Sequence, residues 1–90
     1  MLQSFLEQAV KSFHTQEYAD LIQGLIEARK SAGLTQQDVA DALGKPQSYV
    51  AKIEGCERRL DIAEFIDYSH SIGANPTELF RSMVKNNPKG

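Results

Sequence analysis

The chain has 90 residues, a single cysteine and a formal net charge of −2 at pH 7, and 41% of its residues are hydrophobic. This length suits one domain with one modest core, and the lone Cys56 excludes a disulfide within the chain and fits a reducing cytoplasm. No apolar run reaches the length of a membrane span, no signal-peptide pattern opens the sequence, and the slight acidic excess excludes a surface that is basic throughout.

Residues 1–14 have the apolar spacing of an amphipathic helix. Their apolar side chains recur three or four positions apart, which places them on one helical face, and no Gly or Pro interrupts the pattern. The apolar positions are Leu2, Phe5, Leu6, Ala9, Val10 and Phe13. We therefore expect a helix whose apolar stripe either folds back onto its own domain or contacts another molecule.

A second helix is expected over residues 16–32. Thr15 is a good N-cap residue, and Gly33 can end the helix in the left-handed conformation. The inward face of this helix is apolar except at Arg29, which therefore needs a partner inside the fold. The apolar members of this face are Tyr18, Leu21, Ile22, Leu25 and Ile26.

Two short helices joined by a tight turn are expected between Thr35 and Glu54. Thr35 can cap the first helix, with Asp38 three residues further on. Gly44 permits the turn, and Pro46 suits the first position of the second helix. The residues expected to lock the two helices together are Val39, Ala40, Leu43, Val50 and Ile53. Their spacing leaves the polar side chains of the second helix on its outer face.

The loop at residues 55–60 leads into another helix, and Gly55 is expected to supply a left-handed turn in that loop. Asp61 and Glu64 have the D-x-x-E spacing of a capping box, and Gly73 ends the helix. The stripe expected to be buried consists of Ile62, Phe65, Ile66, Ser69 and Ile72.

A last helix is expected to begin at Pro76, capped by Asn75. Its expected buried face consists of Leu79, Phe80 and Met83. Residues 85–90 lack an apolar period and are expected to fray. No segment has the alternating pattern of a strand, so the fold class should be all-α.

The two short helices resemble the helix-turn-helix of the Cro/phage-repressor-like family, also called the xenobiotic-response-element family. The residues that carry the resemblance are the LTQ run at 34–36, Ala40, Gly44, Val50 and the Ile53-Glu54 pair. The resemblance extends over about residues 18–80. It implies a lambda-repressor-like DNA-binding domain with a five-helix core, which we place at residues 15–84. The patterns described above add an N-terminal amphipathic helix at 1–14 and a flexible tail at 85–90. The resemblance also implies a structural ion pair between Arg29 and Glu54.

The outer face of the second short helix is the candidate surface for reading DNA. A helix fits the major groove, and side chains near its N-terminus reach base edges. Gln47 is expected to bind adenine and Lys52 to bind guanine, while Ser48 can donate or accept at a base edge. The resemblance implies base contacts at these same three positions. The Tyr49 ring either contacts a thymine methyl or the sugar-phosphate backbone, or packs against the domain.

Phosphate contacts are expected from residues around this helix. Gln36 lies at a helix N-terminus, where backbone N–H groups and the helix dipole favour an anion. The resemblance supports this role for Gln36 and implies it for Arg58. Lys45 and Arg59 flank the helix and either contact phosphate or remain solvated. These cations supply the local positive charge that the chain as a whole lacks.

No constellation in the sequence points to catalysis or to a metal. His14 and His70 are isolated from other metal-ligating residues, so no metal is expected. Cys56 has no histidine nearby in the sequence and is expected to be a small residue that fills a loop. We therefore expect a protein that is not an enzyme and needs no cofactor.

These patterns favour a cytoplasmic, sequence-specific regulator of transcription that binds double-stranded DNA, most simply a repressor. One recognition helix covers few base pairs, so a homodimer on a near-palindromic operator is expected, with its interface on residues 1–14 or on the C-terminal helix. Neither a membrane nor a small-molecule effector is expected as a partner. The alternative is a protein-interaction module with weak or lost DNA binding that docks a partner through residues 1–14, and the acidic net charge favours it.

Overall fold

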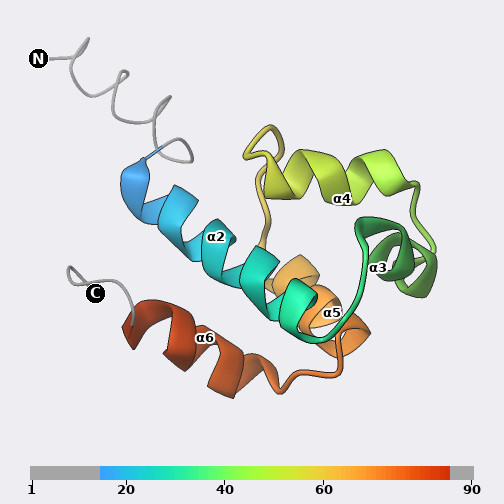
Figure 1. Cartoon of the computed structure of the whole chain (residues 1–90). Coiled ribbons are helices and arrows are strands. Elements are labelled where there is room, and N and C mark those ends of the chain that lie inside the picture. The colour runs from blue at the N-terminus through green and yellow to red at the C-terminus, as the bar shows by residue number, and fades with distance from the viewer. Residues whose placement is uncertain (1–14, 86–90) are drawn as a thin grey trace, which may run out of the picture.

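The structure, a computed structural model, describes residues 15–85, so the helix expected at residues 1–14 lies outside the described residues. Five helices form the described part: α2 (Gln16–Ser31), α3 (Gln36–Leu43), α4 (Gln47–Glu54), α5 (Ile62–Ser71) and α6 (Pro76–Lys85) (Figure 1). Between residues 15 and 85 there is no strand, and the all-α fold class is confirmed. Lys85, the first residue of the expected tail, ends α6, and residues 86–90 lie outside the described range. None of these five helices is both long and apolar enough to span a membrane.

The predicted starts of α2, α3, α5 and α6 are confirmed, because each depends on hydrogen bonds between residues close in sequence. The Thr15 side chain accepts a hydrogen bond from the backbone N–H of the third residue of α2, at 3.1 Å. Thr35 with Asp38, and Asp61 with Glu64, form complete capping boxes at α3 and α5. At α6, the side-chain oxygen of the residue before the helix accepts from two backbone N–H groups, which confirms Asn75 as a cap.

The turn between α3 and α4 confirms one prediction and shifts another by one residue. Gly44 has φ 66°, a left-handed conformation that costs a residue without a Cβ little. Pro46 has φ −68° and ψ 154°, so it precedes α4 as its N-cap rather than forming its first helical residue. The extended backbone at Pro46 lets α4 begin at Gln47.

The prediction that Gly55 supplies a left-handed turn is wrong. Gly55 has φ −87° and its N–H still donates to the Ala51 carbonyl, so it closes the last turn of α4. The left-handed residue is Cys56, with φ 58°, whose N–H donates to the Ile53 carbonyl. The helix therefore continues one residue further than the glycine suggested before the chain turns away.

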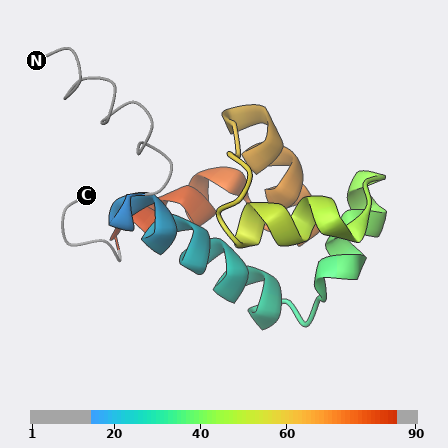
Figure 2. The ribbon, with the colours of Figure 1, turned by 90° about the horizontal axis from the view of Figure 1, so that it is seen from above.

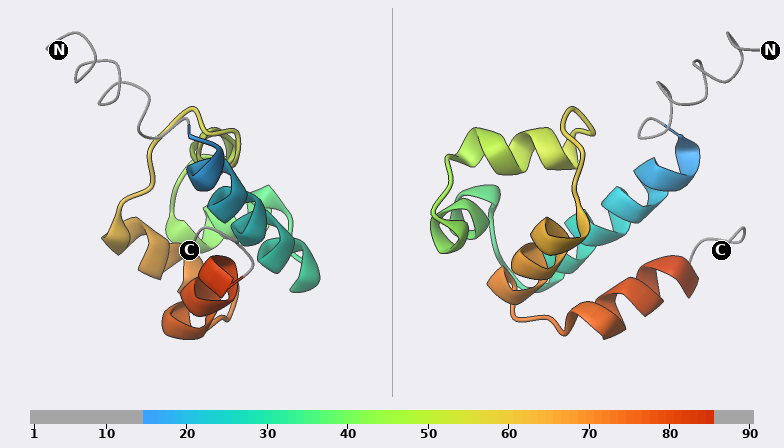
Figure 3. Two further views of the ribbon diagram at one scale, coloured as in Figure 1. Left: turned by 90° about the vertical axis from the view of Figure 1, so that its left-hand side faces the viewer. Right: turned by 180° about the vertical axis from the view of Figure 1, so that it is seen from behind.

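The five helices pack as a closed ring of neighbours in the order α2, α4, α3, α5 and α6. α3 contacts both α4 and α5, and α2 contacts α4 and α6 (Figure 2). The start of α2 and the end of α6 lie at one end of the molecule, while α3 lies at the other (Figure 3). α2 and α6 approach closely at Gly24, where an added Cβ would lie 3.0 Å from the Met83 Cγ. The lack of a side chain at this helical position is what allows the two helices to pack so closely.

The core draws on all five helices. Its buried hydrophobic residues are Ile22, Leu25, Val39, Ala40, Val50, Ile53, Tyr68, Ile72 and Met83. Val50 and Ile53 are both fully buried against the rest of the domain, as predicted for the inner face of α4. This packing fixes α4 and leaves its opposite face toward solvent.

The predicted buried stripe of α5 is partly wrong. Ser69 and Ile72 are buried as expected, but Ile62 is 74% exposed and Ile66 is 38% exposed. Tyr68, which the predicted stripe omitted, is fully buried. The helix is rotated so that this tyrosine, which can satisfy its hydroxyl inside the fold, points inward.

The predicted buried face of α6 is also only partly correct. Met83 is buried and Leu79 is half-buried, but Phe80 is 50% exposed. The Phe80 ring stacks edge-on against Phe65 of α5, with ring centroids 6.2 Å apart. The two exposed isoleucines of α5 and Phe80 line the same groove on the surface between α5 and α6.

Candidate nucleic-acid interface

The outer face of α4 carries the residues predicted to read bases. Gln47, Ser48 and Lys52 are exposed, while Tyr49 is half-buried. α4 lies at the edge of the molecule (Figure 1). Its buried residues, Val50 and Ile53, belong to the shared core. A helix with one side packed and one side polar and exposed is the arrangement that enters a major groove.

The first of these side chains is held by a second glutamine from the preceding helix. Gln47 Nε2 donates to Gln36 Oε1 at 2.6 Å, and Gln36 Nε2 donates to Glu54 Oε1 at 3.0 Å. Gln47, which is predicted to contact a base, and Gln36, which is predicted to contact a phosphate, are therefore hydrogen-bonded to each other. The resulting chain connects the N-terminal end of α4, through α3, to the residue that ends α4.

The ion pair between Arg29 and Glu54 is confirmed. Arg29 Nε donates to Glu54 Oε2 at 2.8 Å and Arg29 Nη2 donates to Oε1 at 2.9 Å. Only 8% of the arginine side chain and 4% of the glutamate side chain are exposed. Arg29 Nη1 also donates to the Leu34 carbonyl at 2.8 Å, so this pair ties α2, the start of α3 and the end of α4 together.

Tyr68 forms a buried cluster with Arg29 and Glu54, and the predicted stripe of α5 omitted it. Its hydroxyl donates to Glu54 Oε2 at 2.5 Å, and burial raises the pKa of this hydroxyl above its ordinary value. A sequence signal was available, because Tyr68 follows Phe65 by three residues and precedes Ile72 by four, which is helical spacing on one face.

The charge of Glu54 is maintained inside the fold by its donors. Burial alone would raise the pKa of its carboxyl group, but hydrogen bonds from Arg29, Tyr68 and Gln36 more than offset this effect. The pKa of Glu54 consequently lies below its ordinary value, and the carboxylate stays ionised. Each of its oxygens accepts two hydrogen bonds, which uses its whole acceptor capacity.

A second cluster lies at the other exposed flank of α4. The Arg58 guanidinium lies 4.6 Å from the centre of the Tyr49 ring, and Lys45 Nζ lies 5.4 Å from it. Arg58 also donates to both oxygens of Glu64, at 3.0 and 2.9 Å, and holds the pKa of that carboxyl at about 2. The Tyr49 ring therefore contacts two cations and packs against the core, and such packing is one of the two alternatives left open for it.

The cations predicted to contact phosphate differ in how exposed they are and in whether a carboxylate binds them. Lys45, in the turn before α4, and Arg59, in the loop after it, are both exposed. Arg58 shares its charge with Glu64, and it also donates to the Arg59 carbonyl at 3.0 Å. Its role as a phosphate contact stays a prediction.

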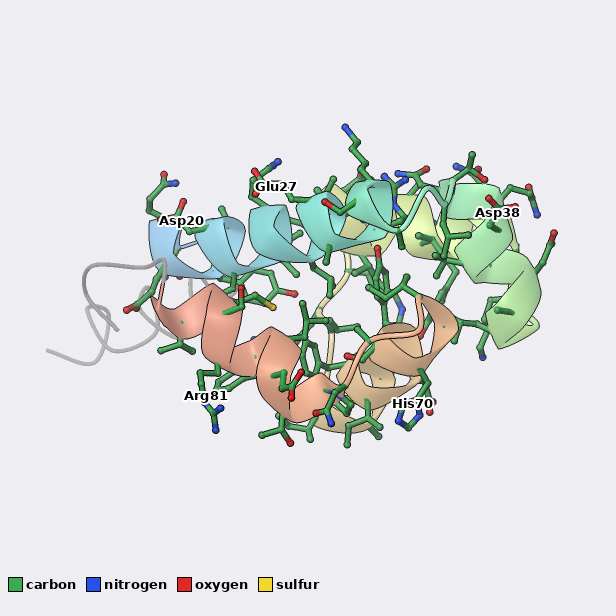
Figure 4. All side chains as sticks on the ribbon, turned by 60° about the horizontal axis from the view of Figure 1, so that its bottom comes forward. Asp20, Glu27, Asp38, His70 and Arg81 are labelled. Atoms are coloured by element: carbon green, nitrogen blue, oxygen red, sulfur yellow. The ribbon has the colours of Figure 1, made fainter. Side chains whose placement is uncertain are left out.

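The described residues contain no group of three or more His, Cys, Asp or Glu side chains that could hold a metal ion. His70 lies on the surface of α5, where Figure 4 shows its ring pointing outward, and His14 lies outside the described residues. Cys56 is half-buried and packs against the core. Its environment agrees with the prediction of a small residue that fills a loop.

The fold and the arrangement of α3 and α4 define a helix-turn-helix DNA-binding domain. Residues 25–79 match the family described as Helix-turn-helix, which covers more than half of the chain. A solved structure, the XRE-family like protein from Pseudomonas syringae pv. tomato str. DC3000, is 43% identical with a TM-score of 0.77 and covers 90% of this chain and 99% of its own. No curated protein matches the chain.

The chain belongs to the Cro/C1-type helix-turn-helix family, which includes XRE-type proteins. The resemblance drawn from the LTQ run, Gly44 and the Ile53-Glu54 pair is thereby confirmed. Membership supports a role as a DNA-binding regulator of transcription, in a family that is typically non-enzymatic.

Proposed function

We propose that this protein is a sequence-specific repressor that binds double-stranded DNA with α4 in the major groove. The observation that carries the proposal is the exposed polar face of α4, on a helix whose opposite side is fully buried. A rigidly held helix presents its side chains to base edges without a large loss of conformational entropy on binding. Occupancy of the operator would then block RNA polymerase.

The residues of this face have distinct proposed roles. Gln47 binds adenine and Lys52 binds guanine, because an amide and an ammonium match the hydrogen-bonding edges of those bases. Ser48 contacts a neighbouring base edge, and the exposed part of the Tyr49 ring contacts a thymine methyl or the backbone. Phosphates are bound by the residues that flank α4 in space: Gln36, Lys45, Arg58 and Arg59.

The test of base readout is alanine substitution followed by binding to an operator selected from a random DNA pool. Gln47→Ala and Lys52→Ala should each weaken binding by about 1–3 kcal/mol and relax the preference at one base pair. Ser71→Ala, on α5 and outside the proposed interface, serves as a control. If both α4 variants bind the operator as the parent does, the proposed docking is wrong.

Phosphate contact is tested through the salt dependence of binding. Arg58→Ala should weaken binding to all sequences alike and lower the slope of log affinity against log salt by about 0.9. Arg81, exposed on α6, offers a matched control, because Arg81→Ala removes the same charge far from α4 (Figure 4). An unchanged slope for Arg58→Ala would show that its ion pair with Glu64 already occupies the guanidinium.

The dimer is proposed to form through the surface between α5 and α6. Three large apolar side chains are exposed there, Ile62, Ile66 and Phe80, which we call the α5–α6 patch. Together with Phe65, they line a groove of about 320 Å³. Exposed apolar groups that lie together mark contact sites, and a second copy that covers the patch would also double the number of bases read.

Matched phenylalanine substitutions in the full-length chain separate the two candidate interfaces. Phe80→Asp places a charge on the α5–α6 patch, and Phe5→Asp places the same charge on the apolar stripe of residues 1–14. We expect Phe80→Asp to shift the protein from dimer to monomer in analytical ultracentrifugation and Phe5→Asp to leave it dimeric. The opposite result would assign the interface to residues 1–14, and a monomeric parent that stays monomeric on DNA would contradict the dimer.

The protein-interaction module is the second candidate, and one observation favours it. Arg58 is paired with Glu64, which reduces the positive charge that α4 can offer to DNA, in a chain whose net charge is −2. A DNA-binding protein should give a steep salt slope of about −0.9 for each neutralised phosphate. A flat slope with genomic fragments would therefore favour the interaction module.

A further inference from the structure

The Arg58 guanidinium uses only three of its five N–H donors inside the protein. Nη1 and Nη2 donate to the two oxygens of Glu64 at 3.0 and 2.9 Å, and Nη1 also donates to the Arg59 carbonyl at 3.0 Å. The Nε–H and the second Nη2–H remain. Neither has a partner among the residues that the structure describes, and 39% of the Arg58 side chain is exposed.

The two remaining donors lie together on one edge of the planar group, which we call the side edge. Arg29 shows what a side edge can bind, because its Nε and Nη2 donate to the two oxygens of Glu54 at 2.8 and 2.9 Å. In Arg58 the carboxylate instead binds the end of the fork, through Nη1 and Nη2. A backbone phosphate also offers two oxygens to such an edge. Arg58 can therefore bind a carboxylate and a phosphate at the same time.

The guanidinium is held between α5 and α4. Glu64 is fixed by the capping box of α5, since its Oε1 accepts from the Asp61 N–H at 3.0 Å and its own N–H donates to Asp61 Oδ1 at 2.8 Å. The Tyr49 ring of α4 lies 4.6 Å from the guanidinium. An arginine that is held in this way before DNA arrives loses less rotamer freedom on binding.

We propose that Glu64 is a positioning residue for DNA binding, which holds the end of the Arg58 guanidinium so that its side edge binds the two free oxygens of one backbone phosphate. The inference rests on the proposed function, because it requires that Arg58 contacts DNA. An acidic residue next to the recognition helix thus supports the binding of an anion, through an arginine that has separate edges for the two.

The first test is Glu64→Gln in the full-length chain, with binding to the selected operator measured across salt concentrations. The change removes a negative charge near the DNA, which by itself would strengthen binding. We expect binding to weaken by about two- to tenfold, because Arg58 is no longer held. The slope of log affinity against log salt should stay unchanged, since the phosphate contact is kept. Tighter binding, or a slope steeper by about 0.9, would show that Glu64 competes with phosphate and would overturn the proposal.

The second test is Arg58→Lys, which keeps the charge and removes the two edges. A lysine ammonium is a single point of charge, so Glu64 should hold it away from the phosphate and the slope should become shallower by about 0.9. Adding Glu64→Gln to this variant should free the ammonium and restore the slope. A parental slope for Arg58→Lys alone would show that any cation suffices, which would contradict the two-edge arrangement.

Two matched controls change the same groups elsewhere. Asp67→Asn removes a carboxylate from an exposed position of α5, and Arg81→Lys makes the same exchange on α6, far from α4 (Figure 4). Neither should alter the affinity or the slope. Thermal unfolding identifies any variant that fails to fold, and Arg58→Lys decides the matter if Glu64→Gln does not fold.

The outcomes separate this inference from the proposed function. If Glu64→Gln binds the operator with the affinity of the parent, the positioning role is overturned and the phosphate contact of Arg58 stands. If Arg58→Ala keeps the parental slope, Arg58 contacts no phosphate and the inference fails, while base reading by α4 is unaffected. If the parent selects no DNA sequence at all, the proposed function and this inference fail together.

Discussion

Two clusters in this protein contain the same three residue types in opposite surroundings. Each has an arginine bound to both oxygens of a glutamate and a tyrosine in contact with the pair. The buried cluster consists of Arg29, Glu54 and Tyr68, and the exposed cluster consists of Arg58, Glu64 and Tyr49. The charged side chains are 8% and 4% exposed in the first cluster, and 39% and 23% exposed in the second.

The difference between the clusters teaches that hydrogen-bond geometry alone does not determine what an ion pair contributes. In the buried cluster, water cannot replace a lost partner, so loss of one charge strands the other inside the protein. In the exposed cluster, water solvates whatever remains, and the pair contributes little to stability. The buried cluster therefore maintains the architecture around α4, while the exposed cluster orients Tyr49 and the loop after α4.

The largest difference between the clusters should come from neutralising each glutamate. Glu54→Gln should lower the free energy of unfolding by about 3–5 kcal/mol, because Arg29 would remain charged and buried without a counter-charge. Glu64→Gln, the matched change, should have a much smaller effect. Urea denaturation of both variants measures the difference. If Glu54→Gln lowered the free energy of unfolding by less than about 0.5 kcal/mol, the buried pair would contribute no more to stability than an exposed one.

Loss of the hydroxyl group should likewise destabilise the buried cluster more than the exposed one, but by less than loss of the glutamate charge. Tyr68→Phe keeps the ring and removes the hydroxyl, which leaves Glu54 Oε2 one donor short, so a loss of about 1–3 kcal/mol in unfolding free energy is expected. Tyr49→Phe is the matched control in the exposed cluster, where water can take the place of the hydroxyl. Equal losses for the two variants would mean that burial does not separate the clusters.

The smallest expected effect is a change in acid sensitivity of the exposed cluster. Arg58 holds the pKa of Glu64 at about 2, below its ordinary value of 4.5, so the stabilisation is complete above pH 4.5 and is lost as the pH falls toward 2. Glu64→Gln should flatten the decline in unfolding free energy over that range. Asp67→Asn removes the same charge from an exposed position of α5 and serves as the control. A parental slope that survives in Glu64→Gln would assign the acid sensitivity to other carboxylates.

Helix boundaries were accessible from the sequence because the interactions that set them are local. The capping box of Asp61 with Glu64 formed as predicted, and the predicted Thr35 cap formed a complete capping box with Asp38. Gly44 adopts the left-handed conformation that the turn requires. The wrong prediction at Gly55 also has a local cause. The hydrogen bonds of α4 continue through Gly55, so the left-handed turn falls at Cys56.

The sequence predicted which residues form the candidate site, but it did not predict most of the hydrogen bonds between them. The sequence identified Gln36, Gln47 and Arg58 as polar residues near the recognition helix, and the resemblance supplied the pairing of Arg29 with Glu54. It did not indicate that the two glutamines bond to each other, or that Arg58 binds Glu64. The partners lie 11 and 6 residues apart along the chain, so the first contact depends on how α3 and α4 are placed and the second on the path of the loop before α5.

What the sequence determined by itself within residues 15–85 was the set of helices, most of their caps and the polar face of α4, because spacing and capping act within a few residues. Only the tertiary structure decided which face of α5 is buried. Ile62 and Ile66 are as apolar as any core residue, yet they are exposed, and Tyr68 took the interior position. The physical reason is that the buried, ionised Glu54 needs four donated hydrogen bonds, and the Tyr68 hydroxyl supplies one of them from across the core, where an isoleucine could supply none.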